Sequence, residues 1–136
     1  SYATGSVTGK ERTGGLVGSA LDSTIITNSY ATGSVTGTSE VGGLVGRANK
    51  SSVTNSYATG SVTGTGSYTG GLVGYAYQSS VTNSYWDTET TGQSSSAGGA
   101  GATGKSTEEM KTSTTYKDWD FDTIWQINEG SYPTLR

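Results

Sequence analysis

The chain has 136 residues, a net charge of −3, 22 glycines and only 30% hydrophobic residues, so we expect one domain or a short repeat array with a narrow core. It contains no cysteine and no histidine, which excludes disulfides and thiolate metal sites and removes the commonest metal ligand and general base. Its eight basic residues do not cluster and no long apolar run is present, so we expect no nucleic-acid binding and no membrane insertion.

Residues 1–85 repeat two phrases at a nearly fixed period. SYATGSVTG and GGLVG each occur three times, and their copies start at Ser1, Ser29 and Ser56 and at Gly14, Gly42 and Gly70. A fourth copy of the first phrase begins at Ser84 and then breaks off. The steps between copies are 27 or 28 residues, a period that is typical of stacked repeat architectures.

The constant phrases are predicted to be strands, and the runs between them, which differ in length, are predicted to be corners. In ATGSVTG, small or apolar residues such as Ala58 and Val62 alternate with hydroxyl residues such as Thr59 and Thr63, which is the period of a β-strand. Three short strands per repeat, with the usual crossover chirality, predict a right-handed parallel β-solenoid of about three 27–28-residue coils.

Stacked coils should place equivalent residues in columns that run along the solenoid. The predicted inward aliphatic ladders are Leu16, Leu44 and Leu72; Val7, Val35 and Val62; and Ile26, Val53 and Val81. Asn28, Asn55 and Asn83 are predicted to stack as an amide ladder in which each side chain bonds the next. The repeated tyrosines should also stack, and the pattern leaves open whether they face inward or outward.

Hydroxyl side chains alternate with the small residues and are predicted to form a flat array on one outward face. This candidate binding face consists of Thr4, Ser6, Thr8, Thr32, Ser34, Thr36, Thr59, Ser61 and Thr63. A regular array of this kind is similar to the ice-binding face of some solenoid antifreeze proteins. The alternative interpretation is an ordinary solvated strand face, because Thr and Ser suit β-strands.

Residues 86–136 lose the period and are predicted to cap the end of the solenoid, which would otherwise expose unpaired strand edges. We expect a Gly/Ser-rich loop at 94–105, one short helix of about two turns from Ser106, which has a capping-box partner in Glu109, and a strand at 119–127. The aromatic residues of this segment are predicted to be buried, although sugar stacking on Trp86, Trp119 and Trp125 is an alternative. Asp118, Asp120 and Asp122 alternate like calcium ligands but lack the spacing of an EF-hand loop.

The phrases Gly15-Leu16-Val17-Gly18, Gly43-Leu44-Val45-Gly46 and Gly71-Leu72-Val73-Gly74, with NSYATGSVTG beside them, resemble the GLUG repeat family. The resemblance covers about residues 1–85 and implies a β-solenoid of the kind found in filamentous-haemagglutinin-like bacterial adhesins. It also implies an extracellular or cell-surface location. Because the chain opens in mid-phrase without a signal peptide, we expect a piece of a longer protein. The family provides no catalytic residue to transfer.

The repeat pattern predicts a non-catalytic structural module with no cofactor and no metal, and the resemblance implies an adhesive role. Its expected partner is a glycan or protein on a surface, and the open first coil suggests end-to-end association into a fibre. Two alternatives are an ice-binding solenoid and a fragment of a carbohydrate-active β-helix enzyme. The second is disfavoured because residues 1–85 hold only Glu11, Asp22 and Glu40 as acidic groups.

Overall fold

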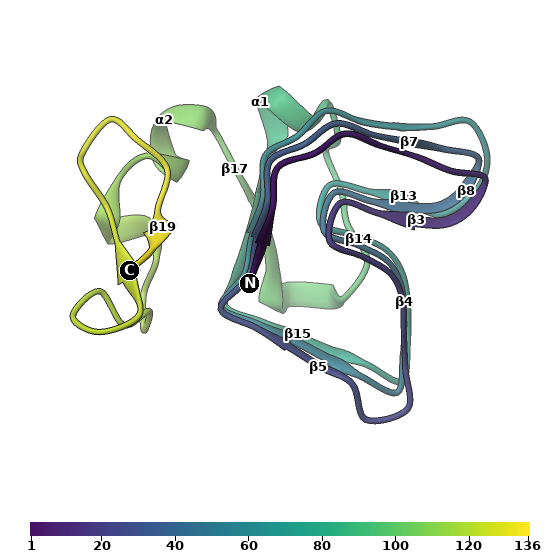
Figure 1. Ribbon diagram of the computed structural model, residues 1–136, viewed down its shortest axis with the longest axis horizontal. Helices are drawn as coiled ribbons and strands as arrows, with labels where there is room; N and C mark the ends of the chain where they lie inside the picture. The colour runs from purple at the N-terminus through teal and green to yellow at the C-terminus, as the bar shows by residue number, and fades with distance from the viewer.

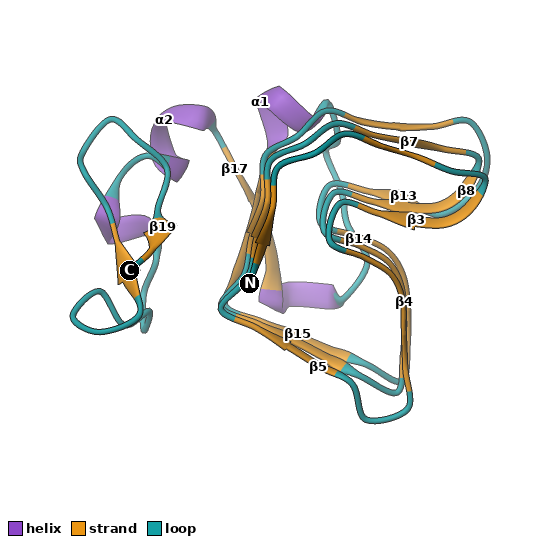
Figure 2. Ribbon diagram, in the orientation of Figure 1, coloured by secondary structure: helices purple, strands orange, loops and turns teal.

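The computed structural model describes residues 1–136 and is a parallel β-solenoid of about three coils, with two short α-helices in the C-terminal part (Figure 1, Figure 2). This confirms the predicted fold class. Each coil contains five short strands rather than the predicted three. The fourth strand of each coil is the longest, with five residues.

The strands of the three coils occupy equivalent places. Coil 1 contains β1 (Tyr2–Ala3), β2 (Val7–Thr8), β3 (Glu11–Gly14), β4 (Val17–Leu21) and β5 (Ile25–Thr27). Coil 2 contains β6 (Tyr30–Ala31), β7 (Val35–Gly37), β8 (Ser39–Gly42), β9 (Val45–Asn49) and β10 (Ser52–Thr54). Coil 3 contains β11 (Tyr57–Ala58), β12 (Val62–Gly64), β13 (Thr69–Gly70), β14 (Val73–Tyr77) and β15 (Ser80–Thr82), and β16 (Ser84–Asp87) follows.

Equivalent strands pair in parallel and in register, so the repeat period becomes the coil period. Tyr2 pairs with Tyr30 and Tyr30 with Tyr57, and Val17 pairs with Val45 and Val45 with Val73. The result is one five-stranded sheet, β1-β6-β11-β16-β17, and four three-stranded sheets that form the other sides of the coil.

The predicted aliphatic ladders are confirmed. The backbone N–H of Leu16 donates to the carbonyl of Leu44 at 3.0 Å, and the backbone N–H of Leu44 donates to the carbonyl of Leu72 at 2.9 Å. Leu44 and Leu72 are fully buried in the main core, and Leu16 packs against the same core at its N-terminal end. The ladder of Ile26, Val53 and Val81 lies in this core as well, and Val7, Val35 and Val62 pair along a neighbouring sheet.

The phrase ATGSVTG is not one continuous strand, and that prediction was wrong. The chain bends at Gly5, Gly33 and Gly60, and the two halves of each phrase belong to different sheets. A Cβ atom on Gly33 would lie 2.0 Å from the carbonyl oxygen of Gly5 in the coil beneath. Glycine is therefore required at this corner because the backbones of successive coils approach too closely for any side chain.

The second and third strands of each coil fold back on one another as an arm that projects from the body of the solenoid (Figure 1). The arm has its own small core of Val35, Val41 and Val62. One residue with a positive φ angle lies in or directly before the third strand of each coil: Arg12 in β3, Glu40 in β8 and Tyr68 before β13, at 51°, 54° and 65°. The arm gives the coil a concave side, because the fourth strand then descends at an angle to it (Figure 2).

The predicted amide ladder is wrong in its bonding. Asn28, Asn55 and Asn83 do occupy equivalent places, but no hydrogen bond joins their side chains, and Oδ1 of Asn55 is buried without a partner. Each asparagine has a positive φ angle of 47–49°, so its role is to adopt a left-handed turn that few other residues tolerate.

The inter-coil bonds that use a side chain at this corner are made by the serine that follows each asparagine. The hydroxyl of Ser56 accepts from the backbone N–H of Ser29 at 3.2 Å and donates to the carbonyl of Thr54 at 2.9 Å. The backbone N–H of Ser56 in turn donates to the hydroxyl of Ser84 at 3.2 Å. These serines form a buried ladder of hydroxyl groups. The sequence pattern did not predict it, because buried and solvated serines repeat with the same period.

Replacing Ser56 by alanine is expected to lower the free energy of unfolding by about 1–3 kcal/mol, because the buried N–H of Ser29 would lose its acceptor. Urea denaturation followed by circular dichroism measures the change. Ser61→Ala, at an exposed position of the same coil, serves as the matched control, and equal effects of the two substitutions would contradict this ladder.

The C-terminal end of the solenoid is covered by residues 86–105. Trp86 lies at this end of the main core, and the helix α1 (Thr88–Thr91) follows it. Beyond α1, the carbonyl of Ser95 accepts from the backbone N–H of Gly71 at 2.9 Å, and the backbone N–H of Ala97 donates to the carbonyl of Val73 at 3.0 Å. The short 3-10 helix η1 (Gly99–Gly101) precedes β17 (Ala102–Lys105), which pairs with β16 in parallel. The Gly/Ser-rich stretch predicted as a loop thus ends in a strand and seals the last coil.

Residues 106–136 do not cover this end as predicted but pack on the side of the solenoid. They contain α2 (Thr107–Met110), the 3-10 helix η2 (Ser113–Thr115) and the antiparallel pair β18 (Trp125–Gln126) and β19 (Thr134–Leu135). The capping box of α2 is confirmed, although the helix has one turn instead of two. The strand predicted at 119–127 is reduced to β18, because residues before it form turns.

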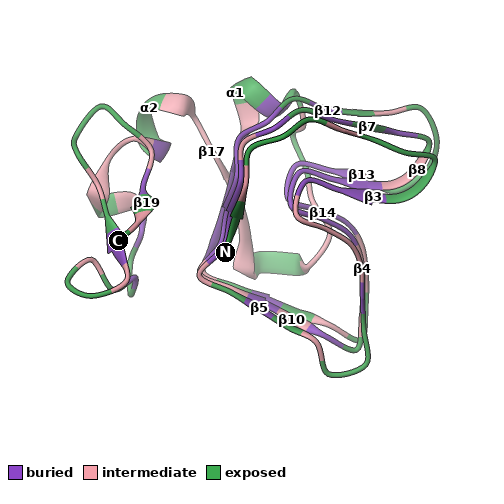
Figure 3. Ribbon diagram, in the orientation of Figure 1, coloured by how far each residue is buried: buried purple, intermediate pink, exposed green.

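The tyrosine ladder faces outward and is covered by residues of the side-packed segment. In Figure 3 this segment, with α2 and β19, lies beside the solenoid. The rings of Tyr2, Tyr30 and Tyr57 stack with centroids 5.1 and 5.0 Å apart, while Ala31 and Ala58 beside them lie in the main core. Trp119 and Trp125 pack on this stack, and the Tyr57 hydroxyl donates to the carbonyl of Pro133. A second aromatic core therefore fixes residues 106–136 to the solenoid.

Asp87 joins the solenoid to both helices and the C-terminal segment, and it is fully buried. It caps α1 by accepting from the backbone N–H groups of Glu89 and Thr90, at 2.9 and 3.0 Å. Its other oxygen accepts from the hydroxyls of Thr107 and Tyr132, at 2.7 and 2.6 Å. Burial alone would raise the pKa of Asp87, but these four hydrogen bonds outweigh it and hold the pKa below its ordinary value.

Candidate functional site

The nine residues of the predicted Thr/Ser face do not form one flat array. Thr4, Thr32 and Thr59 precede the glycine bend, and Thr59 is buried. Only the threonines at 8, 36 and 63 pair in register on one sheet, and the serines at 6, 34 and 61 lie exposed beside the bend. The bend thus separates the columns that an extended strand would have placed on a common plane.

The acidic and aromatic candidates of the C-terminal segment have structural contacts. Asp120 accepts from the backbone N–H groups of Asp122 and Thr123, at 2.9 and 2.8 Å, and so stabilises a turn. No group of three or more His, Cys, Asp or Glu side chains comes together to hold a metal ion. Trp86, Trp119 and Trp125 are buried in the two cores instead of lying open to solvent.

A polar notch lies where the arm meets the body of the solenoid. One wall is the sheet of β3, β8 and β13, and the other is the sheet of β4, β9 and β14 (Figure 1). The hollow between them has a volume of about 270 Å³ and is lined by Glu11, Arg12, Ser39, Glu40, Arg47, Ser67 and Tyr68. We call this set of residues the notch.

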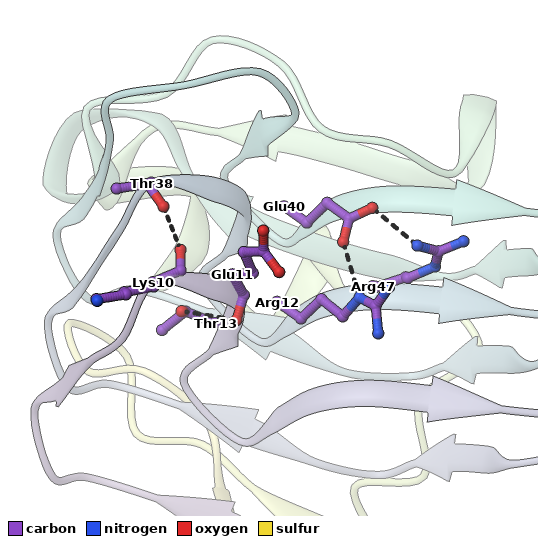
Figure 4. Close-up of polar contacts among 7 residues, drawn as sticks. All are labelled: Lys10, Glu11, Arg12, Thr13, Thr38, Glu40 and Arg47. Carbon is purple, nitrogen blue, oxygen red and sulfur yellow. Dashed lines mark hydrogen bonds and ion pairs between the residues drawn. The ribbon is translucent and has the colours of Figure 1, made fainter.

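Glu40 connects the two walls of the notch (Figure 4). Its Oε2 pairs with Nε of Arg12 at 3.2 Å, and its Oε1 pairs with Nη1 of Arg47 at 3.1 Å. The guanidinium of Arg47 also lies 5.1 Å from the ring centroid of Tyr75, in the next coil. Because Tyr75 packs edge-on against Tyr68 at 4.8 Å, the aromatic and ionic contacts form one continuous cluster along the solenoid axis.

A second hollow, of about 630 Å³, lies at the corner between the fourth and fifth strands. Its lining is almost entirely polar and is formed by Ser23, Thr24, Ile25, Lys50, Ser51, Ser52, Gln78, Ser79 and Ser80. The corner of the first coil is one residue longer than those of the next two, and it projects beyond them (Figure 1). The hydroxyls of Ser51 and Ser79 are already bonded to nearby carbonyls, so this hollow offers few converging free groups.

The N-terminal end of the solenoid is open. Tyr2 is 60% exposed, whereas its ladder partners Tyr30 and Tyr57 are 7% and 1% exposed. A hollow of about 490 Å³ at this end is lined in part by Leu16, Val17 and Ile26, the first members of the core columns. The first strands of all five sheets have one edge without a β partner there. The repeat pattern predicted this open edge, and it also predicted that residues 86–136 cap the opposite end, which residues 86–105 cover.

The buried tyrosines that hold the C-terminal segment have raised pKa values. Burial, and to a smaller extent the neighbouring phenols of Tyr30 and Tyr116, raises the pKa of Tyr57 far above its ordinary value. Burial and the hydrogen bond to Asp87 raise the pKa of Tyr132 to about 12. These phenols therefore remain neutral donors throughout the physiological pH range.

A comparison with protein families found one match, and it covers the solenoid. The family model described as the GLUG motif matches residues 9–36, 37–63 and 65–85. Each segment begins at or just after the second strand of one coil and ends in the next coil or in β16, and together the three include more than half of the chain. No curated protein sequence and no solved structure matches the chain. None of the helices has the length and apolar character needed to span a lipid bilayer.

Proposed function

Since this chain belongs to the GLUG motif family, we propose that it is a non-catalytic structural and adhesive module of a bacterial cell-surface or secreted protein. The observation that carries the proposal is the difference between the two ends of the solenoid. The N-terminal edge exposes unpaired strands and the ends of the core columns, whereas residues 86–105 cover the C-terminal edge. A β-solenoid with one closed end is suited to be the terminal unit of a stacked array.

An added coil should dock on the open edge in the same way that coils 1 and 2 dock on each other. We expect a copy of residues 29–55 placed before Ser1 to raise the Tm by about 5 °C, because it would bury Tyr2, Leu16 and Val17. Differential scanning calorimetry measures the shift, and hydrogen exchange should show new protection of β1 and β4.

A matched control carries the Leu44→Asp change only in the added copy, where it would leave a charge in the core column. If the unmodified copy and this control gave the same Tm, or if β1 and β4 exchanged as before, the edge would not accept a further coil and the structural proposal would be contradicted.

The covered C-terminal edge also limits association between copies. Head-to-tail addition requires an open edge at both ends, so we expect no fibre, in contrast to the association that the sequence suggested. Sedimentation velocity over a wide range of concentrations should show monomers, or at most pairs that meet through their N-terminal ends. A ladder of larger species would contradict this expectation.

A further inference from the structure

The charged residues of the solenoid are concentrated at the notch. Residues 1–85 contain four basic and three acidic side chains, and the five that lie in or beside the notch are Lys10, Glu11, Arg12, Glu40 and Arg47 (Figure 4). The same positions carry different residues in the three coils, in a chain whose strand phrases otherwise repeat almost verbatim. Coil stacking alone requires like residues in each column, so it does not account for this divergence.

The notch presents free donors and free acceptors side by side. Arg12 uses Nε for Glu40 and is 51% exposed in its side chain, and its two terminal nitrogens make no hydrogen bond. The carboxylate of Glu11 likewise makes no hydrogen bond and is exposed. The hollow therefore combines guanidinium donors and carboxylate acceptors, with no excess of either charge among its lining residues.

An aromatic ring adjoins these groups and has a fixed orientation. Tyr68 is 57% exposed, although one side of the ring packs edge-on against Tyr75 with an interplanar angle of 74°. Tyr75 is held in turn by the guanidinium of Arg47. Tyr68 is thus an ordered apolar surface with its free area at the rim of the polar hollow.

We propose that the notch binds a neutral saccharide unit of a glycan. Vicinal hydroxyls of a sugar ring donate and accept at adjacent atoms, which satisfies the exposed carboxylate of Glu11 and the free nitrogens of Arg12 together. The C–H face of the ring stacks on Tyr68. An anionic ligand would be repelled by the two carboxylates of the notch, and a cationic ligand would be repelled by its two guanidinium groups. A neutral polyol is therefore the ligand class that matches these charges.

This inference supplies a ligand class for the adhesive part of the proposed function, whereas the structural part rests on the open edge and is tested separately. The probes are maltohexaose, cellohexaose, mannohexaose and xylohexaose, with tri-galacturonate as the acidic comparison. Each is titrated into the full chain labelled with ¹⁵N, and the amide and arginine Nε signals are followed by NMR.

At least one neutral hexasaccharide is expected to shift the signals of Arg12, Glu40 and Tyr68, with an affinity that changes little in about 0.5 M NaCl because no net charge is paired. Tyr68→Ala and Arg12→Ala should each weaken binding by about tenfold or more. The matched controls are Tyr77→Ala and Lys50→Ala, which remove an exposed ring and a cation outside the notch and should bind as the original chain does.

Three results would overturn the inference. They are an absence of binding to all four neutral probes, binding only to the acidic probe with loss in salt, and binding that survives both notch substitutions. A variant that has lost its fold is recognised by its circular dichroism spectrum, and Tyr68→Phe then provides the second test, since it keeps the ring and should retain binding.

Discussion

Replacing Asp87 by alanine is expected to release residues 106–136 from the solenoid and to lower the free energy of unfolding by about 3–5 kcal/mol. The change would leave four donors without their acceptor, two of them the backbone N–H groups at the start of α1. The loss should appear in urea denaturation and as increased solvent exposure of Trp119 and Trp125, read from their fluorescence.

Two further variants make this expectation specific. Asp122→Ala removes an exposed aspartate whose side chain makes no hydrogen bond, and we expect a change within about 0.5 kcal/mol. Asp87→Asn keeps the shape but removes the charge, and its effect should lie between the other two. If Asp87→Ala were no more damaging than Asp122→Ala, the hydrogen-bonded role of Asp87 would be wrong.

The stability of the chain should also depend on pH at both extremes. The folded-state pKa of Asp87 lies below its ordinary value, so its stabilisation is present above about pH 4 and is lost as the pH falls through the folded value. The pKa of Tyr132 is raised to about 12, so its contribution is complete below about pH 10 and is lost as the pH rises toward 12. In the Asp87→Asn variant, the free energy of unfolding should depend less on pH in the acid range.

Replacing Leu44 by alanine is expected to lower the free energy of unfolding by about 2–5 kcal/mol, because Leu44 is fully enclosed between its ladder partners. Leu16→Ala makes the same chemical change at the open end, where the side chain is only partly buried, and should cost less than half as much. Urea denaturation of the two variants measures both values. Equal losses would mean that the two leucines do not differ in their stacking.

The period and the aliphatic columns could be predicted because every coil must bury the same side chains over those of its neighbour. The bend at Gly33 could not, since alternation of small and hydroxyl residues is the same in a straight strand and in one that turns at a glycine. Its cause is the approach of two backbones, which lies outside any single repeat. The prediction of a flat hydroxyl face was wrong for the same reason, because it assumed a straight strand.

The C-terminal segment shows a different limit of sequence reasoning. Its aromatic residues indicate burial, but composition does not say which surface they cover. The outward tyrosine stack provides that surface, and its direction depends on Ala31 and Ala58 facing the core. The notch likewise depends on an arm whose returning strand β8 has a positive φ angle at Glu40, a conformation that no residue pattern in the sequence indicated.

The most direct test of in-register coil stacking is disulfide formation between introduced cysteines, since the chain has none of its own. Thr36 and Thr63 pair in adjacent coils, and adjacent strands lie about 4.8 Å apart, within the reach of a disulfide. The Thr36→Cys, Thr63→Cys pair should therefore oxidise readily, as mass spectrometry would show. The Thr8→Cys, Thr63→Cys pair, two coils apart, should remain reduced, and equal oxidation of both pairs would contradict the stacked solenoid.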